Sequence, residues 1–253
     1  MAFSDRQVVE LFHLHLLRLL AGRDKAHIAL KGGCNLRLFF GSIRYSEDMD
    51  LDVAQALEPH ALKEKMTSLL AGAALRTSLG GQGIELAGAS APKQTETTQR
   101  WKAELRVRGK PVSLHTKVEF SRRPKTEEAV LEAVAPSVVQ AYQMLPVLLR
   151  HYPLQTAIVQ KVRALVGRQA VQARDVFDLS VLFTRAGGKA EALASEQALI
   201  ARAIERAMEV SYDDYQGQVV AFLDPEQASA YSSREAWDAL QILVVDALQR
   251  AGR

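Results

Sequence analysis

Cysteine is almost absent from this chain of 253 residues, since Cys34 is the only one. A single cysteine excludes an intramolecular disulfide and a cysteine-based zinc cluster, and it agrees with a reducing compartment. Long apolar runs are also missing, because stretches such as Ile242 to Val245 are far too short to cross a bilayer. Met1 to Asp24 lacks the basic start and small-residue cleavage site of a signal peptide. We therefore expect a cytoplasmic protein.

The composition is that of a globular protein, with 48% hydrophobic and 24% charged residues. The net charge of +3 hides an asymmetry, because residues 190–253 carry 5 Lys/Arg against 11 Asp/Glu. The most basic stretch runs from Lys93 to Lys125, with 10 basic and 3 acidic residues. A cluster of this kind suits a polyanion such as RNA. It is equally typical of a solvated sheet face with extended basic side chains.

The first part of the chain shows short apolar patterns separated by glycine turns. Ser4 is a candidate N-cap for a helix whose apolar residues recur at helical spacing up to Leu20. His27 to Leu30 predicts a strand, which ends at Lys31-Gly32-Gly33 and is followed by a short helix closed by Gly41. These patterns predict the order strand, glycine turn, helix.

The residues from Asp48 to Val53 alternate strictly between acidic and apolar. A strand here would place Asp48, Asp50 and Asp52 on one face and the apolar residues on the other. Pro59 to Leu75 predicts one helix, and two later strands, 99–107 and 112–121, would form a hairpin through Gly109-Lys110.

Beyond about Glu132 the glycine turns become rarer and the patterns are mainly helical. Helices are predicted over 154–165, 174–183, 190–210 and 234–251. We therefore predict an α+β domain over residues 1–135 and a mainly helical domain over residues 136–253.

Asp48 and Asp50 are the candidate metal ligands. Nucleotide transfer from a triphosphate needs divalent ions that orient the phosphates and stabilise the leaving pyrophosphate, and such ions bind carboxylate oxygens. Two aspartates at alternate strand positions point the same way, so both can reach one metal ion or a close pair. Glu119, on a later strand, is the inferred third carboxylate.

Upstream of these acids, Gly32-Gly33 would let the backbone approach a phosphate closely, and the first amides of the next helix would face its charge. Taken singly, neither a glycine pair nor an Asp-x-Asp is specific, because many such pairs are merely solvated. Their combination in a fixed order is more informative.

That ordered combination resembles the polymerase β nucleotidyltransferase superfamily, and more closely the AbiEii/AbiGii toxin family of type IV toxin–antitoxin and phage-defence systems. The resemblance covers residues 27–183 and rests on four motifs. These are Leu30-Lys31-Gly32-Gly33, Arg44-Tyr45-Ser46-Glu47-Asp48-Met49-Asp50-Leu51, Lys117-Val118-Glu119-Phe120-Ser121, and Lys161-Val162-Arg163-Ala164-Leu165 with Arg174-Asp175-Val176-Phe177-Asp178-Leu179.

The resemblance implies a polymerase β-type nucleotidyltransferase domain with a mixed sheet and flanking helices, followed by a helical domain that completes the nucleotide site. It also implies roles for matching positions. Asp48 and Asp50 would bind Mg²⁺ or Mn²⁺, while Gly32, Gly33 and Ser46 would cradle phosphates. Lys161 and Asp175 would be catalytic, with Lys161 also binding the nucleotide. The family's Gly-Gly-Thr-Ala form is here Gly32-Gly33-Cys34-Asn35, so no hydroxyl contact is expected from position 34.

The later motif is also physically reasonable without the family. Lys161 can serve as a point charge on a triphosphate, and Asp175 lies at the start of a predicted helix. An exposed helix lysine is nevertheless often only solvated, and an aspartate at such a position, Asp178 included, often only stabilises a helix N-terminus.

The expected function is therefore Mg²⁺-dependent transfer of a nucleoside monophosphate from an NTP to a hydroxyl of an RNA, such as tRNA, or of a protein. The family implies that such an enzyme is a toxin with a cognate antitoxin as its partner. The candidate RNA-binding residues are Arg100, Lys102, Arg106, Arg108, Arg122 and Arg123. A nucleotide- or RNA-binding module without turnover, or a nucleotidyltransferase for small molecules, remains as an alternative.

Overall fold

The computed structural model describes residues 3–22, 27–123, 128–194 and 196–252. Its fold is α+β, as the sequence predicted, and it divides into two compact units. Unit 1 comprises Met1–Asn35 and Tyr45–Tyr152, and unit 2 comprises Leu36–Arg44 and Pro153–Arg253. In the described part of the chain, no helix is long and apolar enough to span a membrane.

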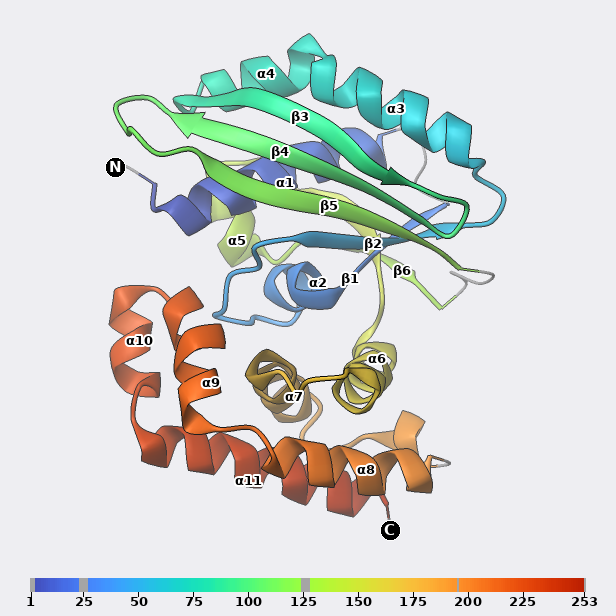
Figure 1. The fold of residues 1–253 in the computed structure, drawn as a ribbon, viewed down its shortest axis with the longest axis vertical. Coiled ribbons are helices and arrows are strands. Elements are labelled where there is room, and N and C mark those ends of the chain that lie inside the picture. Colours follow the sequence, from blue (N-terminus) through green and yellow to red (C-terminus); the bar gives the residue numbers. More distant parts are fainter. Residues whose placement is uncertain (1–2, 23–26, 124–127, 195, 253) are drawn as a thin grey trace. The chain divides into compact units, whose positions relative to one another are not determined.

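Unit 1 contains a seven-stranded mixed sheet with the order β3-β4-β5-β2-β1-β7-β6 (Figure 1). The pairs β2–β5 and β1–β7 are parallel, and the other neighbours are antiparallel. The strands are β1 (Ile28–Lys31), β2 (Met49–Ala54), β3 (Ile84–Gln94), β4 (Thr98–Val107), β5 (Leu114–Arg123), β6 (Val130–Ala133) and β7 (Leu148–His151).

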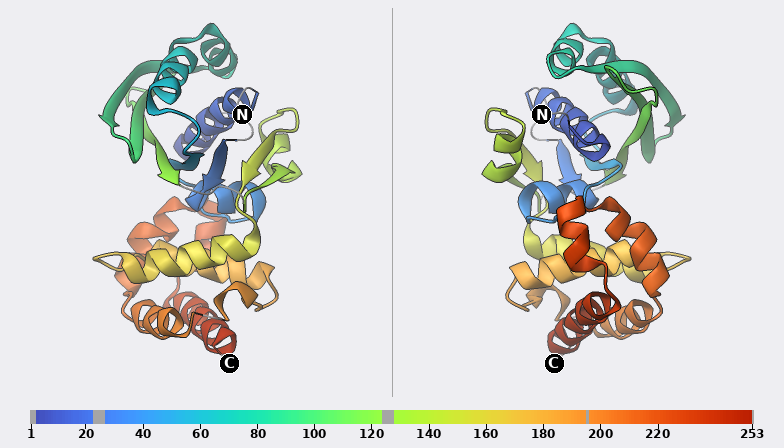
Figure 2. Two further views of the ribbon diagram at one scale, coloured as in Figure 1. Left: turned by 90° about the vertical axis from the view of Figure 1, so that its right-hand side faces the viewer. Right: turned by 90° about the vertical axis from the view of Figure 1, so that its left-hand side faces the viewer.

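One face of this sheet is apolar and is covered by helices. Met49, Leu51 and Val53 alternate along β2 and are at most 1% exposed, as the strand pattern predicted. Figures 1 and 2 show the helices α1, α3 and α4 on one side of the sheet. The helices of unit 1 are α1 (Asp5–Ala21), α3 (Pro59–Ala71), α4 (Ala73–Gly80) and α5 (Pro136–Ala141), and the short α2 (Gly32–Phe39) begins in this unit.

Two of these helices show how local sequence sets the element ends. Ser4 caps α1 as predicted, because its hydroxyl accepts from the Gln7 amide while the Gln7 side chain accepts from the Ser4 amide. The single helix predicted over 59–75 is wrong, since Gly72 adopts extended dihedrals, ends α3 and precedes α4. A glycine in mid-helix favours such a break.

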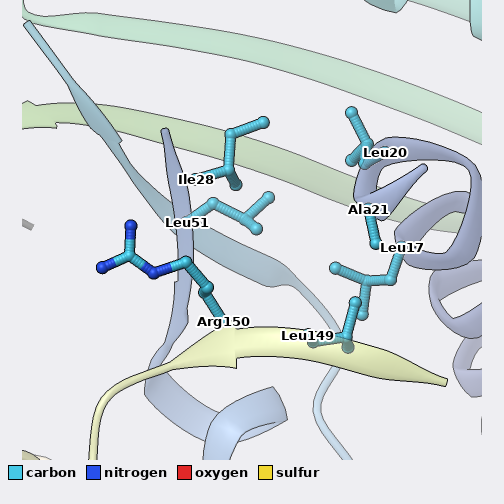
Figure 3. Close-up of a pocket in the computed structure, with 7 residues that line it drawn as sticks. All are labelled: Leu17, Leu20, Ala21, Ile28, Leu51, Leu149 and Arg150. Carbon is cyan, nitrogen blue, oxygen red and sulfur yellow. The ribbon is translucent and has the colours of Figure 1, made fainter. Parts of the chain in front are cut away.

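A small apolar pocket opens between α1 and the sheet (Figure 3). Its lining is Leu17, Leu20, Ala21, Ile28, Leu51, Leu149 and Arg150. The only charged lining residue, Arg150, donates to the carbonyl of Ala129. Since Leu51 and Asp50 are adjacent in β2, they point to opposite faces, and the pocket lies away from the acidic face.

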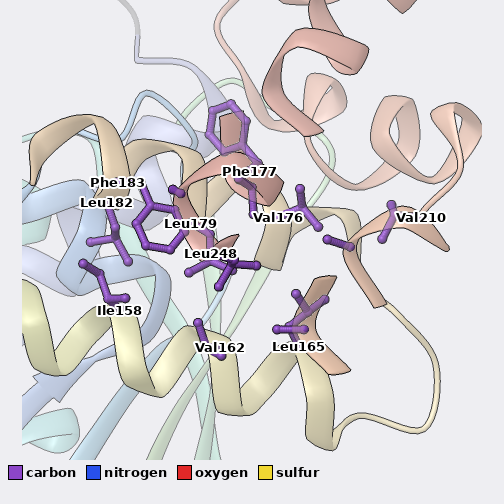
Figure 4. Packing of buried hydrophobic residues seen from close by; sticks show 14 of the residues in the cluster. Ile158, Val162, Leu165, Val176, Phe177, Leu179, Leu182, Phe183, Val210 and Leu248 are labelled. Atoms are coloured by element: carbon purple, nitrogen blue, oxygen red, sulfur yellow. The ribbon is translucent and has the colours of Figure 1, made fainter. Parts of the chain in front are cut away.

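Unit 2 is helical. Its elements after residue 153 are α6 (Leu154–Gly167), α7 (Ala173–Arg185), η1 (Glu191–Leu193), α8 (Gln197–Met208), α9 (Tyr212–Gln218), η2 (Val220–Phe222), α10 (Pro225–Tyr231) and α11 (Arg234–Ala251). The central helix is α7, which packs against α6, α9 and α11. Figure 4 shows side chains of α6, such as Ile158 and Val162, packed with Leu182 of α7 and Leu248 of α11. The predicted helix over 190–210 is divided into η1 and α8.

The division between units differs from the boundary predicted near residue 135. Residues 136–152 stay in unit 1, because they contain α5 and β7, and β7 pairs with β1. In addition, residues 36–44 belong to unit 2, where Leu36, Phe40 and Ile43 join its apolar core.

Candidate functional site

The acidic residues of the Asp-x-Asp motif lie at the start of β2. Asp48 immediately precedes β2, and Asp50 and Asp52 lie within it on the face opposite Leu51. Asp50 is the register partner of Glu119 on the parallel strand β5 and of Lys31 on the antiparallel strand β1. The sheet therefore places the side chains of Lys31, Asp50 and Glu119 side by side, as partners in register share a face.

Basic side chains pair with most of these carboxylates. The Lys117 Nζ lies 2.8 Å from the Asp48 Oδ2. Arg100 contacts the Glu119 Oε2 at 2.6 Å through Nε and 2.5 Å through a terminal nitrogen. Lys117 and Arg100 thus lie at the centre of the candidate site, although no role for Lys117 was predicted from the sequence. Its position two residues before Glu119 was the available signal, because it places both side chains on one face.

Asp52 has a different environment from Asp48. It is 4% exposed, accepts from the Tyr152 hydroxyl at 2.8 Å, and pairs with Lys31 at 2.5 Å. These contacts tie β2 to β1 and to the end of unit 1. Asp52 is therefore a structural acid, and Asp48 and Asp50 are the two left for a ligand.

The carboxyl group of Asp50 is perturbed by its surroundings on this face. Burial raises the pKa of its carboxyl group, and the neighbouring Glu119 and Asp48 carboxylates raise it further. Lys31 and Lys117 act in the opposite direction and do not cancel this effect. A divalent cation beside Asp50 would remove the repulsion among these acids.

Gly32 approaches the same carboxylate from the end of β1. Its φ of +68° lies in the left-handed region, and a Cβ at this position would lie 3.1 Å from the Asp50 Oδ2. Glycine is thus required both by the backbone conformation and by the close approach to Asp50. Gly32 and Gly33 lie in the first turn of α2. The first backbone N–H groups of a helix point out of its N-terminal end, which is here the end beside Asp50.

The segment that carries Asp48 is held by several side chains. The Ser46 hydroxyl donates to the Asp48 carbonyl at 2.8 Å, and the buried Cys34 thiol donates to the same oxygen at 3.3 Å. The Thr116 hydroxyl donates to the Glu47 carbonyl at 2.7 Å. Position 34 thus makes a thiol contact to the backbone of this segment.

His13 completes this buried network from α1. Its Nε2 lies 2.7 Å from the Thr116 Oγ, and its Nδ1 lies 3.7 Å from the Cys34 Sγ. Burial lowers the pKa of His13 to about 4, so the ring is neutral at pH 7. Because the Thr116 proton goes to the Glu47 carbonyl, the neutral ring donates through Nε2.

Lys161 and Asp175 meet in unit 2, within a buried charge network. The Lys161 Nζ lies 3.2 Å from Asp175 and 2.5 Å from Asp178. Arg168 contacts Asp175 at 2.6 Å, and Arg44 contacts Asp178 at 3.1 Å. Both aspartates are 0% exposed. Asp175 lies in the first turn of α7, as the sequence predicted.

Asp178, like Asp175, contacts two cations in this network. Burial alone would raise the pKa of Asp178, but the Arg44 guanidinium and the Lys161 ammonium hold it below its usual range. The roles of Arg44 and Arg168 were not predicted from the sequence. Arg44 lies 134 positions before its partner Asp178, and Arg168 follows the end of α6, where no local pattern indicates a contact with Asp175.

The candidate RNA-binding residues divide into different environments. Alternation along β4 places Arg100, Lys102 and Arg106 on one face, and Arg108 follows the end of the strand. Arg106 pairs with Glu104 at 3.0 Å. Arg122 donates to the carbonyls of Ala54, Leu57 and Glu96 and to the Gln99 side chain. The side chain of Arg123, and Lys125, lie outside the described residues.

The acids of the sheet face supply only part of a metal site by themselves. Among the residues that the structure describes, no three or more His, Cys, Asp or Glu side chains form a group arranged to hold a metal ion. Asp48 and Asp50 supply hard oxygen donors on one face, which fits Mg²⁺ or Mn²⁺. Glu119 is aligned with Asp50, but its Oε2 contacts Arg100.

Comparison with known proteins gives a family and a fold. The model of the nucleotidyl transferase AbiEii toxin family, type IV toxin–antitoxin system, matches residues 16–249. A candidate nucleotidyltransferase from H. pylori has a similar structure, with a TM-score of 0.58, 19% identity, and coverage of 99% of this chain and 100% of that chain.

JHP933 from Helicobacter pylori is similar to the same degree, with a TM-score of 0.57, 19% identity, and coverage of 99% of this chain and 96% of that chain. At this level of identity the likeness shows the fold. No curated protein sequence matches the chain.

Proposed function

The chain belongs to the AbiEii nucleotidyltransferase toxin family of type IV toxin–antitoxin systems, and from this premise we propose that it transfers a nucleoside monophosphate from an NTP to a hydroxyl of an RNA or protein acceptor. The proposal includes a requirement for Mg²⁺ or Mn²⁺. The supporting observation is the sheet face on which Asp48 and Asp50 follow each other at alternate positions, with Glu119 in register and Gly32 against Asp50.

In the proposed mechanism Asp48 and Asp50 would hold the divalent ion, and Glu119 is the third candidate ligand. When bound, that ion supplies Lewis-acid chemistry to the phosphates and the attacking hydroxyl. The backbone at Gly32 and Gly33 accommodates the phosphates closely, because no Cβ intervenes. Ser46 contributes by fixing the Asp48 carbonyl, a contact that its hydroxyl already makes.

Lys161 and Asp175 stay proposed members of the nucleotide site. Within unit 2 the Lys161 ammonium is held between Asp175 and Asp178, so its position is defined by two buried acids. A lysine in this setting can interact with charge that develops on transferred phosphates. Its replacement by alanine is expected to weaken triphosphate binding and slow transfer, with arginine a poor substitute.

The experiment that tests the chemistry uses each labelled NTP in turn, with magnesium and either total RNA or cell lysate. Asp48→Ala and Asp50→Ala are each expected to abolish labelling while the fold is kept. Thermal stability should hold or rise, because removing either acid relieves repulsion on this face. Near-normal labelling by either variant at saturating magnesium would show that these aspartates do not form the metal site.

The RNA acceptor needs a separate test, because Arg100 and Arg106 are partly neutralised by Glu119 and Glu104. Reversal of Arg106 and Arg108 to glutamate is expected to weaken RNA binding and to flatten its dependence on salt, since each phosphate contact releases a counterion. NTP binding should change little. If RNA binding and its salt slope stay the same, the basic face is only solvated, and a protein or small-molecule acceptor is favoured.

We also propose that the protein acts as the toxin of a type IV system, with a cognate antitoxin and a role in phage defence. This part rests on the family alone. Expression with and without a candidate antitoxin tests it, and growth arrest that depends on Asp48 and is relieved by that antitoxin would support it.

A further inference from the structure

The charges on the acidic face of unit 1 are arranged in pairs. The Lys117 Nζ forms an ion pair with the Asp48 Oδ2 at 2.8 Å, and a terminal nitrogen of Arg100 forms one with the Glu119 Oε2 at 2.5 Å. Lys31 is committed to Asp52 at 2.5 Å. Two of the three candidate metal ligands therefore already have a cationic partner. Asp50 is the third candidate ligand and is the register partner of Glu119.

A divalent ion must compete with these side chains for the same oxygens. Near Asp48 it would meet a carboxylate whose charge Lys117 already balances, and it would be repelled by the ammonium group. All four side chains are partly exposed to solvent. The exposed fraction is 31% for Lys117 and 38% for Asp48, and it is 34% for Arg100 and 21% for Glu119. Partial solvation makes each pair weak enough to exchange partners.

A triphosphate changes this balance, because it brings several negative charges next to the metal. Lys117 and Arg100, once released from Asp48 and Glu119, would then have phosphate oxygens as new partners. Both side chains have several rotatable bonds, so their charged groups can change position without movement of the backbone. Charge-assisted hydrogen bonds to phosphate are among the strong ones available to these groups.

We propose that Lys117 and Arg100 couple metal binding to nucleotide binding, so that the site takes up a divalent ion together with a nucleoside triphosphate far better than either alone. The inference rests on the proposed function and deepens it, since it assigns phosphate binding to two residues. Coupling of this kind is reciprocal: the triphosphate raises metal affinity by the same factor as the metal raises triphosphate affinity.

The test measures Mn²⁺ binding by the loss of the free-ion electron paramagnetic resonance signal. The full-length protein is titrated with and without an NTP analogue that has an unreactive methylene bridge between its α and β phosphates. Lys117→Met removes the ammonium and keeps the stem, whereas Lys117→Arg keeps the charge. Lys63→Met is the matched control, because Lys63 is exposed on α3 of the same unit.

Without the analogue, Lys117→Met is expected to bind Mn²⁺ about fivefold to tenfold more tightly than the unchanged protein, at the low end of typical coupling effects. The analogue should also raise the Mn²⁺ affinity of Lys117→Met less than it raises that of the unchanged protein, by about the same fivefold to tenfold factor. Lys63→Met should behave like the unchanged protein, and Lys117→Arg should keep more of the coupling than Lys117→Met because it keeps the positive charge. Arg100→Met should shift the coupling in the same direction and serves as a second variant if Lys117→Met does not fold.

Two negative results have different meanings. If the variants and the unchanged protein bind Mn²⁺ equally, and the analogue raises all affinities by one factor, the coupling role of Lys117 and Arg100 is refuted and the proposed function stands. If no form of the protein binds the analogue with or without Mn²⁺, the proposed function itself fails and the coupling role with it.

Discussion

Replacing Gly32 with alanine tests whether its close approach to Asp50 matters for function. The substitution adds one methyl group at a position with φ +68°, and that carbon would lie 3.1 Å from the Asp50 Oδ2. The change therefore has two effects, a backbone strain and a local clash. Gly83 separates these effects, because it has φ +74° and a Cβ added there would meet nothing within 4 Å. Gly83→Ala therefore introduces the backbone strain alone, and the difference between the two variants gives the effect of the clash.

The two effects differ in size and in readout. The left-handed conformation costs a non-glycine residue about 1–2 kcal/mol, so Gly32→Ala and Gly83→Ala should both lower the free energy of unfolding by about that amount. For a protein of this length, each kcal/mol lowers the Tm by about 2–4 °C. The clash in Gly32→Ala must also move the Asp50 carboxylate by a few tenths of an ångström, which is expected to slow transfer about tenfold, since an error of about 1 Å costs roughly 100-fold.

The assay pairs a denaturant melt with Mn²⁺ affinity and NTP labelling for both variants. Gly32→Ala should lose stability, metal affinity and labelling, whereas Gly83→Ala should lose stability alone. If Gly32→Ala keeps full Mn²⁺ affinity and labelling while losing the same stability as Gly83→Ala, then the contact between Gly32 and Asp50 has no part in function.

Three further outcomes follow from buried polar groups. Thr116→Val should lower the free energy of unfolding by about 1–3 kcal/mol, because it leaves a carbonyl without its donor, whereas Thr116→Ser should be close to unchanged in a urea melt. Burial raises the pKa of the Cys34 thiol, so iodoacetamide should label it slowly in the native protein and rapidly in urea; fast native labelling would contradict its burial. Arg44 and Lys161 hold the pKa of Asp178 in the folded protein below its usual range. The ionised Asp178 carboxylate therefore stabilises the fold fully above the unfolded pKa of about 3.9, and this stabilisation is lost as the pH falls through the lower pKa of the folded state. Asp178→Asn should therefore cost about 3–5 kcal/mol at pH 7 and weaken the acid dependence of stability; an unchanged acid profile would refute this role.

The parts of the fold that the sequence predicted well depend on local patterns. The alternation after Asp48, the N-cap at Ser4 and the hairpin through Gly109 each arise from residues close together in the chain, and β2, α1 and the β4–β5 pair confirm them. Their side chains specify a conformation without distant partners.

Strands β3 and β7 were not predicted, for different reasons. Gly88, Ser90 and Pro92 favour no regular strand, and β3 is an edge strand with two register shifts that accommodate them. By contrast, β7 is short, and its pairing of His151 with Leu30 joins residues far apart in sequence. No local pattern contains that information.

The candidate site shows the same limit at the level of side chains. Asp48, Asp50 and Glu119 could be proposed from alternation and order, but the ion pairs of Lys117 and Arg100 depend on the register of three strands. Likewise, Arg44 and Asp178 meet across 134 positions of the chain. Charge partners at such separation are fixed by tertiary structure.

The assignment of residues 36–44 to the helical unit has a consequence for folding during synthesis. A fragment that begins at Pro153 would lack the Leu36, Phe40 and Ile43 side chains of its own core, and Asp178 would lose Arg44. On the ribosome, these residues emerge more than a hundred positions before the helices with which they pack, and β1 likewise emerges long before β7. Neither unit can therefore complete its core until the chain has passed Tyr152, so folding of both is delayed to the later part of translation.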